Sequence, residues 1–265
     1  MDNNPRVSLI FVNYHSAQYL ERALESLFLY EHEREFFEVI VVNNDVAESQ
    51  AIQVMQQKFN FLFIDNKTNQ GFGYGCNCGF ASARGDIIGF INPDVLWMGV
   101  YMRAILDFFN TQPKVGIVGM MLLDEKKQIE KWSAGYEPSI ANLLCNNFFL
   151  NRSLFVQKQP LSFPDWVSGG ALFIRATLFS DIGGFDDRFF LYFEDVDLCR
   201  EVRKRGFAVV RHAYFPITHL RGKSSQTSTQ KKQFYRSQRQ YFQKHRPRWE
   251  QNVLLLLHVF FRKTA

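Results

Sequence analysis

The sequence predicts an α/β fold in which a mostly parallel central sheet is flanked by helices. Two nearly continuous apolar runs, residues 7–13 and 39–42, have the composition of strands that are buried on both faces of a parallel sheet. They lie about 30 residues apart, which is the spacing of a β-α-β unit. Between them, leucines recur at helical spacing from Leu20 to Leu27, after Ser16, a residue type that favours helix N-termini. The N-terminal part therefore has the pattern of a nucleotide-binding α/β domain.

The alternation of helices and strands continues to about residue 122. The expected elements are a helix over 48–58, a strand over 61–64, a Gly- and Asn-rich passage over 69–79 that leads into a helix through Ala83, a strand over 86–91, a helix over 102–110 and a strand over 115–122. Residues 124–165 show no clear period, so we expect a long excursion with binding loops. Order returns at Trp166 with a turn, a strand and a short helix.

Polar residues directly follow three of these strands, at Asn13, at 43–45 and at 92–94. Ligands of open α/β sheets bind beyond the carboxyl ends of the strands, so we expect these residues to line one crevice. The glycines of 69–79 lack the G-x-G-x-x-G spacing and do not follow the first strand, which excludes the usual dinucleotide-binding motif.

A predicted helix over 194–205 begins with three acids, Glu194, Asp195 and Asp197, and ends with three cations before Gly206. Acids in a first helical turn often serve only the helix dipole. Here they follow the aromatic run 189–193, and a carboxylate that is partly desolvated beside such a wall is a candidate general base.

Seven blocks in order make the chain similar to inverting glycosyltransferases of family 2, and within them to a rhamnosyltransferase-like group. The blocks are VNYHS, VIVVNND, NQGFGYGCNCGF, FINPD, DWVSGGALFIR, GGFDDRFFLYFEDVDLC and ITHLRGKSS, over roughly residues 7–225. The resemblance implies a GT-A (Rossmann-like) fold and a catalytic domain over 1–225. Residues up to about 122 would bind the nucleotide sugar, and 123–225 would bind the acceptor.

The resemblance also assigns roles at the reacting centre. Asp94 is expected to bind a divalent cation, Mn²⁺ or Mg²⁺, that bridges the donor diphosphate, and His219 matches a histidine that completes the metal site in some relatives. Asp195 matches the catalytic base, and Glu194 would orient the site or the acceptor. Asn92, which replaces the usual first acid, would lie near the ribose or the sugar.

The remaining donor-binding positions follow from the same resemblance. Relatives have Val-Asp-Asn where this chain has 42–45, so either the Asn43 amide recognises the pyrimidine edge or Asp45 takes over; we favour Asn43. Tyr14 packs on the base or belongs to the core. The other expected donor contacts are Asn13, Asn69, Gly71, Phe72, Arg221 and Lys223.

On the acceptor side, the expected contacts are Trp166, Gly169, Gly170 and Asp186. Trp166 would stack on a sugar, although core packing explains it nearly as well. Asp186 lies in a segment that is typical of a turn, with acceptor contact as the other interpretation.

The charge is divided unevenly along the chain. The net charge is +5, but residues 221–265 hold eleven Lys and Arg against the single acid Glu250, so this tail carries +10 and residues 1–220 carry −5. We expect 226–265 to form a basic amphipathic helical tail that binds an anionic membrane surface rather than nucleic acid. A chain that ends near Ser225 is then expected to keep the site and to lose membrane association.

The predicted function is metal-dependent, inverting transfer of a sugar, with dTDP-L-rhamnose as the favoured donor, onto a saccharide or polyprenyl-diphosphate-linked acceptor in cell-surface polysaccharide assembly. The alternatives are a UDP-sugar donor or a catalytically silent sugar-binding or assembly protein. Unpaired cysteine spacing and the lack of a signal-peptide pattern predict a cytoplasmic protein, peripheral on the inner face of the membrane. The oligomeric state is left open.

Overall fold

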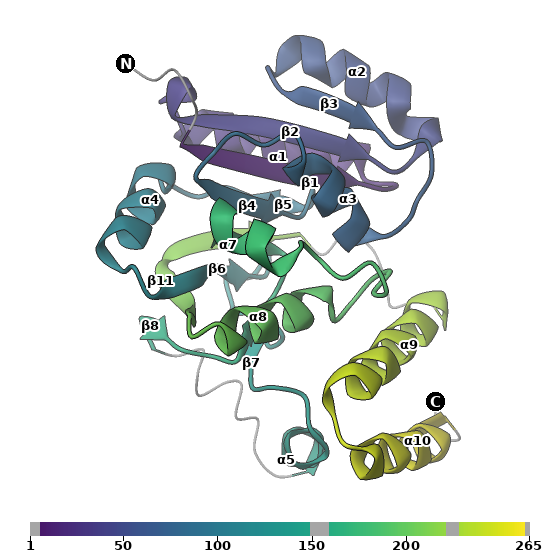
Figure 1. The fold of residues 1–265 in the computed structure, drawn as a ribbon. Coiled ribbons are helices and arrows are strands. Elements are labelled where there is room, and N and C mark those ends of the chain that lie inside the picture. The colour runs from purple at the N-terminus through teal and green to yellow at the C-terminus, as the bar shows by residue number, and fades with distance from the viewer. Residues whose placement is uncertain (1–5, 149–158, 221–227, 263–265) are drawn as a thin grey trace.

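The computed structural model describes residues 6–148, 159–220 and 228–262 of the 265-residue chain (Figure 1). Arg221 and Lys223, two expected donor contacts, lie outside the described residues. No helix within the described residues has the length and apolar character that crossing a membrane requires.

A nine-stranded mixed sheet forms the centre of the described part of the chain, in the order β3-β2-β1-β4-β10-β6-β11-β5, with β8 beside β11. Strands β1 to β4 pair in parallel, whereas β10 runs antiparallel to both of its neighbours. Strands β7 and β9 form a separate pair. The strands are β1 Val7–Asn13, β2 Phe37–Asn43, β3 Leu62–Asp65, β4 Ile87–Ile91, β5 Val95–Leu96, β6 Val115–Leu123, β7 Ala134–Gly135, β8 Leu161–Ser162, β9 Trp166–Val167, β10 Ala171–Arg175 and β11 Ala208–His219.

Helices cover both faces of this sheet. The α-helices are α1 Ala17–Tyr30, α2 Ser49–Lys58, α3 Phe72–Phe80, α4 Met102–Thr111, α5 Ile140–Phe148, α7 Ala176–Ile182, α8 Glu194–Lys204, α9 Ser228–His245 and α10 Arg248–Arg262. Short 3-10 turns precede β2 and α2, at Arg34–Phe36 and Val46–Glu48.

The alternation of side chains along β1 explains its continuous apolar run. Leu9 and Phe11 pack in the core beneath α1, α2 and α4, while Ile10 and Val12 pack in a second core beneath α3, α7 and α8. Because both faces are covered, an unpaired polar side chain would be costly along the strand. Ser8, the polar residue before Asn13, is buried but donates from its Oγ to Glu38 Oε1 at 2.6 Å. The expected α/β fold with a helix-flanked sheet is therefore confirmed, with antiparallel strands inserted in its second half.

The Gly- and Asn-rich passage itself forms helix α3, rather than leading into a later helix. Glycine costs about 1 kcal/mol relative to alanine in a helix. The cost is offset by close packing, because a Cβ at Gly79 would collide with Ile10, and one at Gly75 would collide with Val12. The glycines thus let the helix lie directly on β1.

The tail packs against the rest of the molecule as two adjoining helices, α9 and α10 (Figure 1). Tyr241 and Phe242 of α9 and Leu254 of α10 are buried in a third apolar cluster together with Phe193 and Val196, which flank the start of α8. The predicted helices are confirmed, but the apolar face of α9 is directed at the protein.

Candidate active site

The polar residues at the ends of β1 and β2 meet, as their parallel register requires. Asn13 and Asn43 are register partners, and Asn13 Nδ2 donates to Asn43 Oδ1 at 2.9 Å and to Glu48 Oε2 at 2.8 Å. Glu48 also accepts from the Ser16 backbone N–H at 2.9 Å. Asn13 therefore fixes the corner between β1, β2 and the start of α1.

The Asn43 amide is completely buried and is occupied by contacts within the protein. Its Nδ2 donates to the Asp45 carbonyl at 2.7 Å and to Ser49 Oγ at 3.1 Å, and its Oδ1 also accepts from the Asp45 N–H at 3.1 Å. These bonds use the donors and acceptors of the amide. No amide group of Asn43 is left for a base. Asp45 is also buried, with Oδ1 accepting from the Ala47 N–H at 3.0 Å, but within the described residues its other oxygen is held only by a surface histidine.

Asp45 is buried beside this corner, whereas Tyr14 is exposed next to it. Asp45 Oδ2 lies 2.5 Å from His15 Nδ1, and the Tyr14 ring is exposed and contacts the His15 ring at a centroid distance of 4.1 Å. Tyr14 thus belongs to the surface rather than to the core. The His15 ring thus contacts both the exposed Tyr14 ring and the buried Asp45 carboxylate.

The loop before α3 packs on the aromatic run that precedes α8. Phe72 N donates to the Phe190 carbonyl at 3.0 Å, and Asn69 Oδ1 accepts from Gly71 N at 3.0 Å. Gly71 has φ +107°, and a Cβ there would collide with the Phe190 backbone. Glycine is therefore required for the contact that joins the first half of the chain to the segment bearing the acids.

Glu194 and Asp195 begin α8 immediately after two aromatic residues in left-handed conformations, Tyr192 at φ 68° and Phe193 at φ 72°. Such conformations are unfavourable for aromatic residues and persist where the surroundings impose them. The turn sets the direction of the two carboxylates. Asp195 Oδ2 accepts from Gly169 N at 2.8 Å, and Oδ1 accepts from Val196 N at 2.8 Å.

The two adjacent acids have different tendencies to ionise. Burial and the charge of Asp195 raise the pKa of Glu194 well above its usual range. Burial also raises the pKa of Asp195, but the N–H donors of Gly169 and Val196 counteract this rise. Two neighbouring carboxylates do not both ionise readily, so Asp195 loses its proton before Glu194 does. This order suits Asp195 as a proton acceptor.

A second group of polar side chains joins the end of β4 to β11. His219 Nε2 lies 3.1 Å from Asp94 Oδ1, and its Nδ1 lies 3.1 Å from Glu130 Oε1. Pairing of β11 with β5, His219 opposite Val95, brings the histidine to Asp94. Burial alone lowers the pKa of His219, but the two carboxylates outweigh it and raise the pKa to about 9.

This group has donor atoms that fit a divalent cation. The Asp94 carboxylate and the Nε2 of His219 converge, while Glu130 faces the opposite ring nitrogen. Histidines that bind metals commonly donate their other N–H to a carboxylate, which fixes the ring and increases its basicity. Mixed carboxylate and imidazole donors suit Mn²⁺ better than Mg²⁺, which prefers oxygen ligands.

Asp94 and Asp195 lie in neighbouring parts of one site. Asn92 N donates to the Gly170 carbonyl at 2.9 Å, and the adjacent Gly169 N donates to Asp195. Gly169 and Gly170 thus connect the end of β4 with the start of α8. A Cβ at Gly169 would meet both Asp195 and Phe72, so this glycine lies directly beside the proposed base. The expected acceptor contact of the two glycines stays a prediction.

The other two expected acceptor contacts have structural partners. Trp166 Nε1 donates to the Tyr136 carbonyl at 2.9 Å, and its ring packs against two of the apolar clusters. Asp186 pairs with Arg188 at 2.5 Å and with Lys244 of α9 at 2.7 Å. These pairs hold the pKa of Asp186 below its usual range despite the opposing effect of burial.

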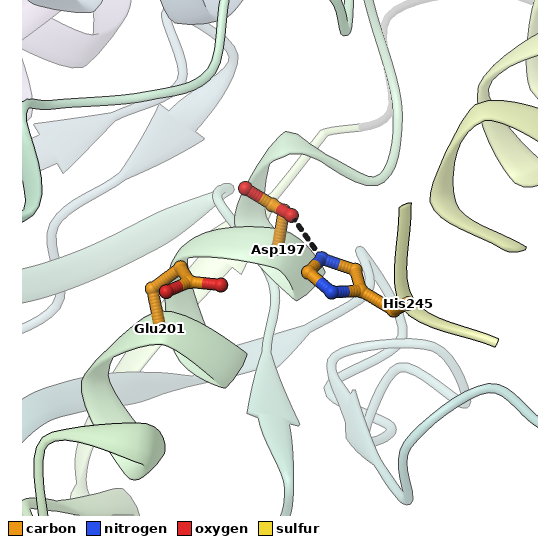
Figure 2. A group of neighbouring side chains, drawn as sticks. All are labelled: Asp197, Glu201 and His245. Atoms are coloured by element: carbon orange, nitrogen blue, oxygen red, sulfur yellow. Dashed lines mark hydrogen bonds and ion pairs between the residues drawn. The ribbon is translucent and has the colours of Figure 1, made fainter. Parts of the chain in front are cut away.

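A further cluster, Asp197, Glu201 and His245, lies between α8 and α9 (Figure 2). Its carboxylate and imidazole atoms are close enough together to hold a metal ion. However, Asp197 is already paired on Oδ1 with His245 Nε2 at 2.5 Å and on Oδ2 with Lys244 Nζ at 2.8 Å. The Lys244 ammonium supplies the positive charge that a metal would bring, so we interpret the cluster as the attachment of α9 to α8.

Glu130 is the site residue that the sequence did not predict. It lies within the excursion over 124–165, where no period or motif marks it. Glu130 N donates to the Leu122 carbonyl at 3.0 Å, so a short turn after β6 returns it to the sheet beside β11. Its proximity to His219 is thus a product of the tertiary fold.

Comparisons with known proteins agree with this arrangement. The glycosyl transferase family 2 model matches residues 8–178, more than half of the chain. An N-acetylglucosaminyl-diphospho-decaprenol L-rhamnosyltransferase of Mycobacterium tuberculosis is 26% identical over 242 residues, which cover 82% of this chain and 76% of that protein. Rhamnosyltransferase WbbL of Escherichia coli K12 is 24% identical over 223 residues, covering 80% and 81%.

Solved structures share the fold at low identity. The mannosyltransferase PcManGT from Pyrobaculum calidifontis, in complex with GDP-Man and Mn²⁺, superposes with a TM-score of 0.64 at 17% identity, over 91% of this chain and 64% of that chain. S. aureus TarS in complex with UDP gives 0.61 at 16% identity, over 88% and 63%. The chain spans less than two thirds of both structures. With the GT-A fold confirmed and the family model matched over most of the sheet, this chain belongs to glycosyl transferase family 2.

Proposed function

We propose that the protein is a metal-dependent, inverting glycosyltransferase that moves L-rhamnose from dTDP-L-rhamnose to a saccharide on a polyprenyl-diphosphate carrier. The observation that supports this most strongly is the linkage of two chemically different groups within one site. Asp94 with His219 provides a cation-binding corner, and Asp195 provides a carboxylate, joined through Gly169 and Gly170.

The proposed reaction is a single displacement. Asp195, held by the N–H groups of Gly169 and Val196, accepts the proton of the acceptor hydroxyl as the hydroxyl oxygen attacks the anomeric carbon. Attack occurs on the face opposite the leaving diphosphate, so the configuration inverts. No covalent sugar intermediate forms, so Glu194 needs no nucleophilic role. A divalent cation held by Asp94 and His219 would neutralise the diphosphate.

The donor nucleotide is proposed to lie over the corner formed by β1 and β2. The exposed Tyr14 ring offers a stacking surface for the base. The buried Asp45 carboxylate would accept from a base N–H in place of its present contact with the exposed His15. Asn69, Gly71 and Phe72 would border the nucleoside, with Asn92 near the sugar. The choice of L-rhamnose and of a lipid-linked acceptor rests on the names of the Mycobacterium and Escherichia relatives. Membrane association on the cytoplasmic face would follow from such an acceptor.

The first test is a donor panel assayed with Mn²⁺ for release of the nucleoside diphosphate. We expect turnover with dTDP-L-rhamnose and a polyprenyl-diphosphate-linked N-acetylglucosamine acceptor, and much less with UDP-glucose, UDP-N-acetylglucosamine or UDP-galactofuranose. If the enzyme preferred a UDP-sugar, the assigned donor would change but the proposed reaction class would stand. Donor binding without turnover on any acceptor would instead favour the silent sugar-binding alternative.

A further inference from the structure

Helix α10 is apolar on two sides, and only one of them is used by the fold. Leu254 is buried, and Val253 and Leu257 pack against the same apolar cluster. Glu250, on this inner side, pairs with Arg246 and accepts from Ile140 N at 2.9 Å. The helix is therefore anchored without help from its remaining apolar residues.

The outer side of α10 presents four exposed apolar residues, Trp249, Leu255, Leu256 and Val259, which we define as the apolar stripe. The exposed polar Asn252 lies among them. All four side chains are exposed, and their spacing of three, four and seven residues places them on one helical face. The fold does not bury these side chains. Single exposed apolar residues are common on protein surfaces, whereas aligned rows of large ones mark binding surfaces.

The exposed charged residues of the described tail are all cations. Arg248 is exposed beside Trp249 at the start of the helix, and α9 exposes Lys231, Lys232 and Arg236. Glu250, the single acid after residue 220, is buried and paired. By contrast, Lys244 pairs with Asp197 and Arg246 pairs with Glu250, so part of the tail charge is used internally.

We infer that the α10 stripe is a docking surface for an anionic lipid bilayer. A 15-residue helix is shorter than the roughly 20 residues needed to span the hydrocarbon core, so it would lie in the interface plane with the stripe inserted and the cations at the headgroups. Tryptophan is suited to that boundary because its ring is apolar and its N–H is polar. The exposed charge complements anionic lipid, with each cation near the surface adding to the attraction.

This surface lies close to the proposed base. The inner face of α10 shares its apolar cluster with Phe193 and Val196, which flank Glu194 and Asp195. If α10 docks on the bilayer, the start of α8 lies against the same apolar cluster as the docked helix. The advantage for a lipid-linked acceptor rests on the proposed function, whereas the docking surface itself does not.

The test measures co-sedimentation of the full chain with phosphatidylcholine vesicles that contain or lack phosphatidylglycerol, with no donor or acceptor present. The test variant is Leu256→Glu/Val259→Glu. Its matched control, Leu29→Glu/Val54→Glu, makes the same charge change at helical residues of nearly equal exposure: Leu29 is 65% and Leu256 61% exposed, and Val54 is 60% and Val259 58%. We expect the stripe variant to lose at least about tenfold in binding to anionic vesicles, with the control unchanged.

Lipid charge and salt provide a second discrimination. Wild-type binding should fall without phosphatidylglycerol and should fall again between about 0.1 M and 0.5 M NaCl, because salt screens the attraction of the cations. Equal binding of the stripe variant and the control to anionic vesicles would overturn the inference. So would a stable dimer, seen by light scattering, that the stripe substitutions break while vesicle binding persists, because the occupant would then be a second copy.

A milder substitution covers the case in which the double variant does not fold. Vesicles with brominated acyl chains should quench the tryptophan fluorescence of the wild-type protein, and Trp249→Phe should remove that quenching while the protein still sediments with the vesicles. Quenching that is unchanged in Trp249→Phe would show that another surface meets the bilayer. Because no step requires turnover, a wrong donor or acceptor assignment would leave these results unaffected.

Discussion

At the scale of single residues, Asp195 is the group on which the proposed chemistry depends most. Replacement by asparagine preserves the shape and an oxygen acceptor for Gly169 N, but removes the ability to take a proton. We expect Asp195→Asn to lower kcat by about 10³-fold, within the range of general-base contributions, with donor affinity retained. Nucleoside diphosphate release and calorimetric donor titration measure the two effects. Asp107→Asn, an exposed aspartate on α4, is the matched control.

The same carboxyl gives the expected direction of the pH dependence. The base acts only when ionised, and burial raises its pKa above that of an ordinary aspartate, about 3.9. kcat should therefore fall as the pH decreases through this raised pKa, at a higher pH than for an exposed aspartate. A rate that stays flat down to pH values near the ordinary aspartate pKa, or full transfer by Asp195→Asn, would contradict the assignment.

Glu130 is expected to act on metal binding through His219. Its Oε1 faces His219 Nδ1, so Glu130→Gln retains a hydrogen-bonding partner but removes the charge that supports the imidazole. Loss of such a partner typically weakens metal affinity by about 10–100-fold. Mn²⁺ titration by water-proton relaxation, with dTDP present and without turnover, measures this directly. Glu125→Gln, at an exposed position in the same loop, should be neutral, and unchanged Mn²⁺ affinity in Glu130→Gln would disprove the role.

At the scale of elements, the sequence predicts those whose stability comes from a local pattern. β1 and β2 have continuous apolar runs because helices cover both sheet faces, and α8 begins with acids and ends with cations. β11 lacked such a signal, since Arg211, His212 and Pro216 interrupt its apolar residues. The structure shows why they are tolerated: the pairing with β6 shifts register between His212 and Pro216, and β8 accompanies β11 at Arg211.

This missed strand explains which part of the site the sequence could not supply. The motifs marked His219 and Asp94 individually, but β11 is the element that brings His219 to β5 and to Glu130. Likewise, the occupancy of the Asn43 amide depends on Asn13, Ser49 and the Asp45 backbone together. Residue types near strand ends were predictable, whereas their partners depended on tertiary pairing.

The attachment of α9 to α8 provides a stability prediction. Lys244 Nζ contacts both Asp186 and Asp197, and the Asp197 side chain is almost completely buried. Lys244→Met would remove a cation from a buried carboxylate that keeps the His245 imidazole as its remaining side-chain partner. We expect a loss of about 2–3 kcal/mol in the free energy of unfolding, somewhat less than the usual cost of breaking a buried pair. Urea denaturation measures the loss.

Lys232→Met is the control for that substitution, because Lys232 is exposed on the same helix. Surface substitutions of this kind usually change the free energy of unfolding by less than about 0.5 kcal/mol. Equal denaturation midpoints for the two variants would show that the ion pairs between α8 and α9 do not stabilise the fold.

At the scale of the whole molecule, the C-terminal tail packs against the part of the chain that contains the proposed catalytic residues. The acidic part of the chain contains Asp94 and Asp195, and the tail begins after His219, as the charge distribution indicated. However, α9 donates from Ser237 Oγ to the Leu191 carbonyl at 2.7 Å, and its Phe234 ring lies 5.4 Å from that of Phe193. The tail thus also supports the strained turn before the proposed base.

Removal of the tail should therefore damage the site as well as membrane association. A chain that ends at Ser225 would expose Phe189, Phe193 and Val196, each of which gains about 1.5–3 kcal/mol from burial, a total comparable with the whole stability of many domains. It would also leave Asp197 without Lys244 and His245. We expect a large fall in Tm and loss of transfer even with a water-soluble acceptor. A chain that ends at Pro247 keeps α9 and should be less affected in both measurements. If the chain ending at Ser225 kept the Tm and the transfer rate of the full protein, the tail would be an independent docking segment, as its charge alone had suggested.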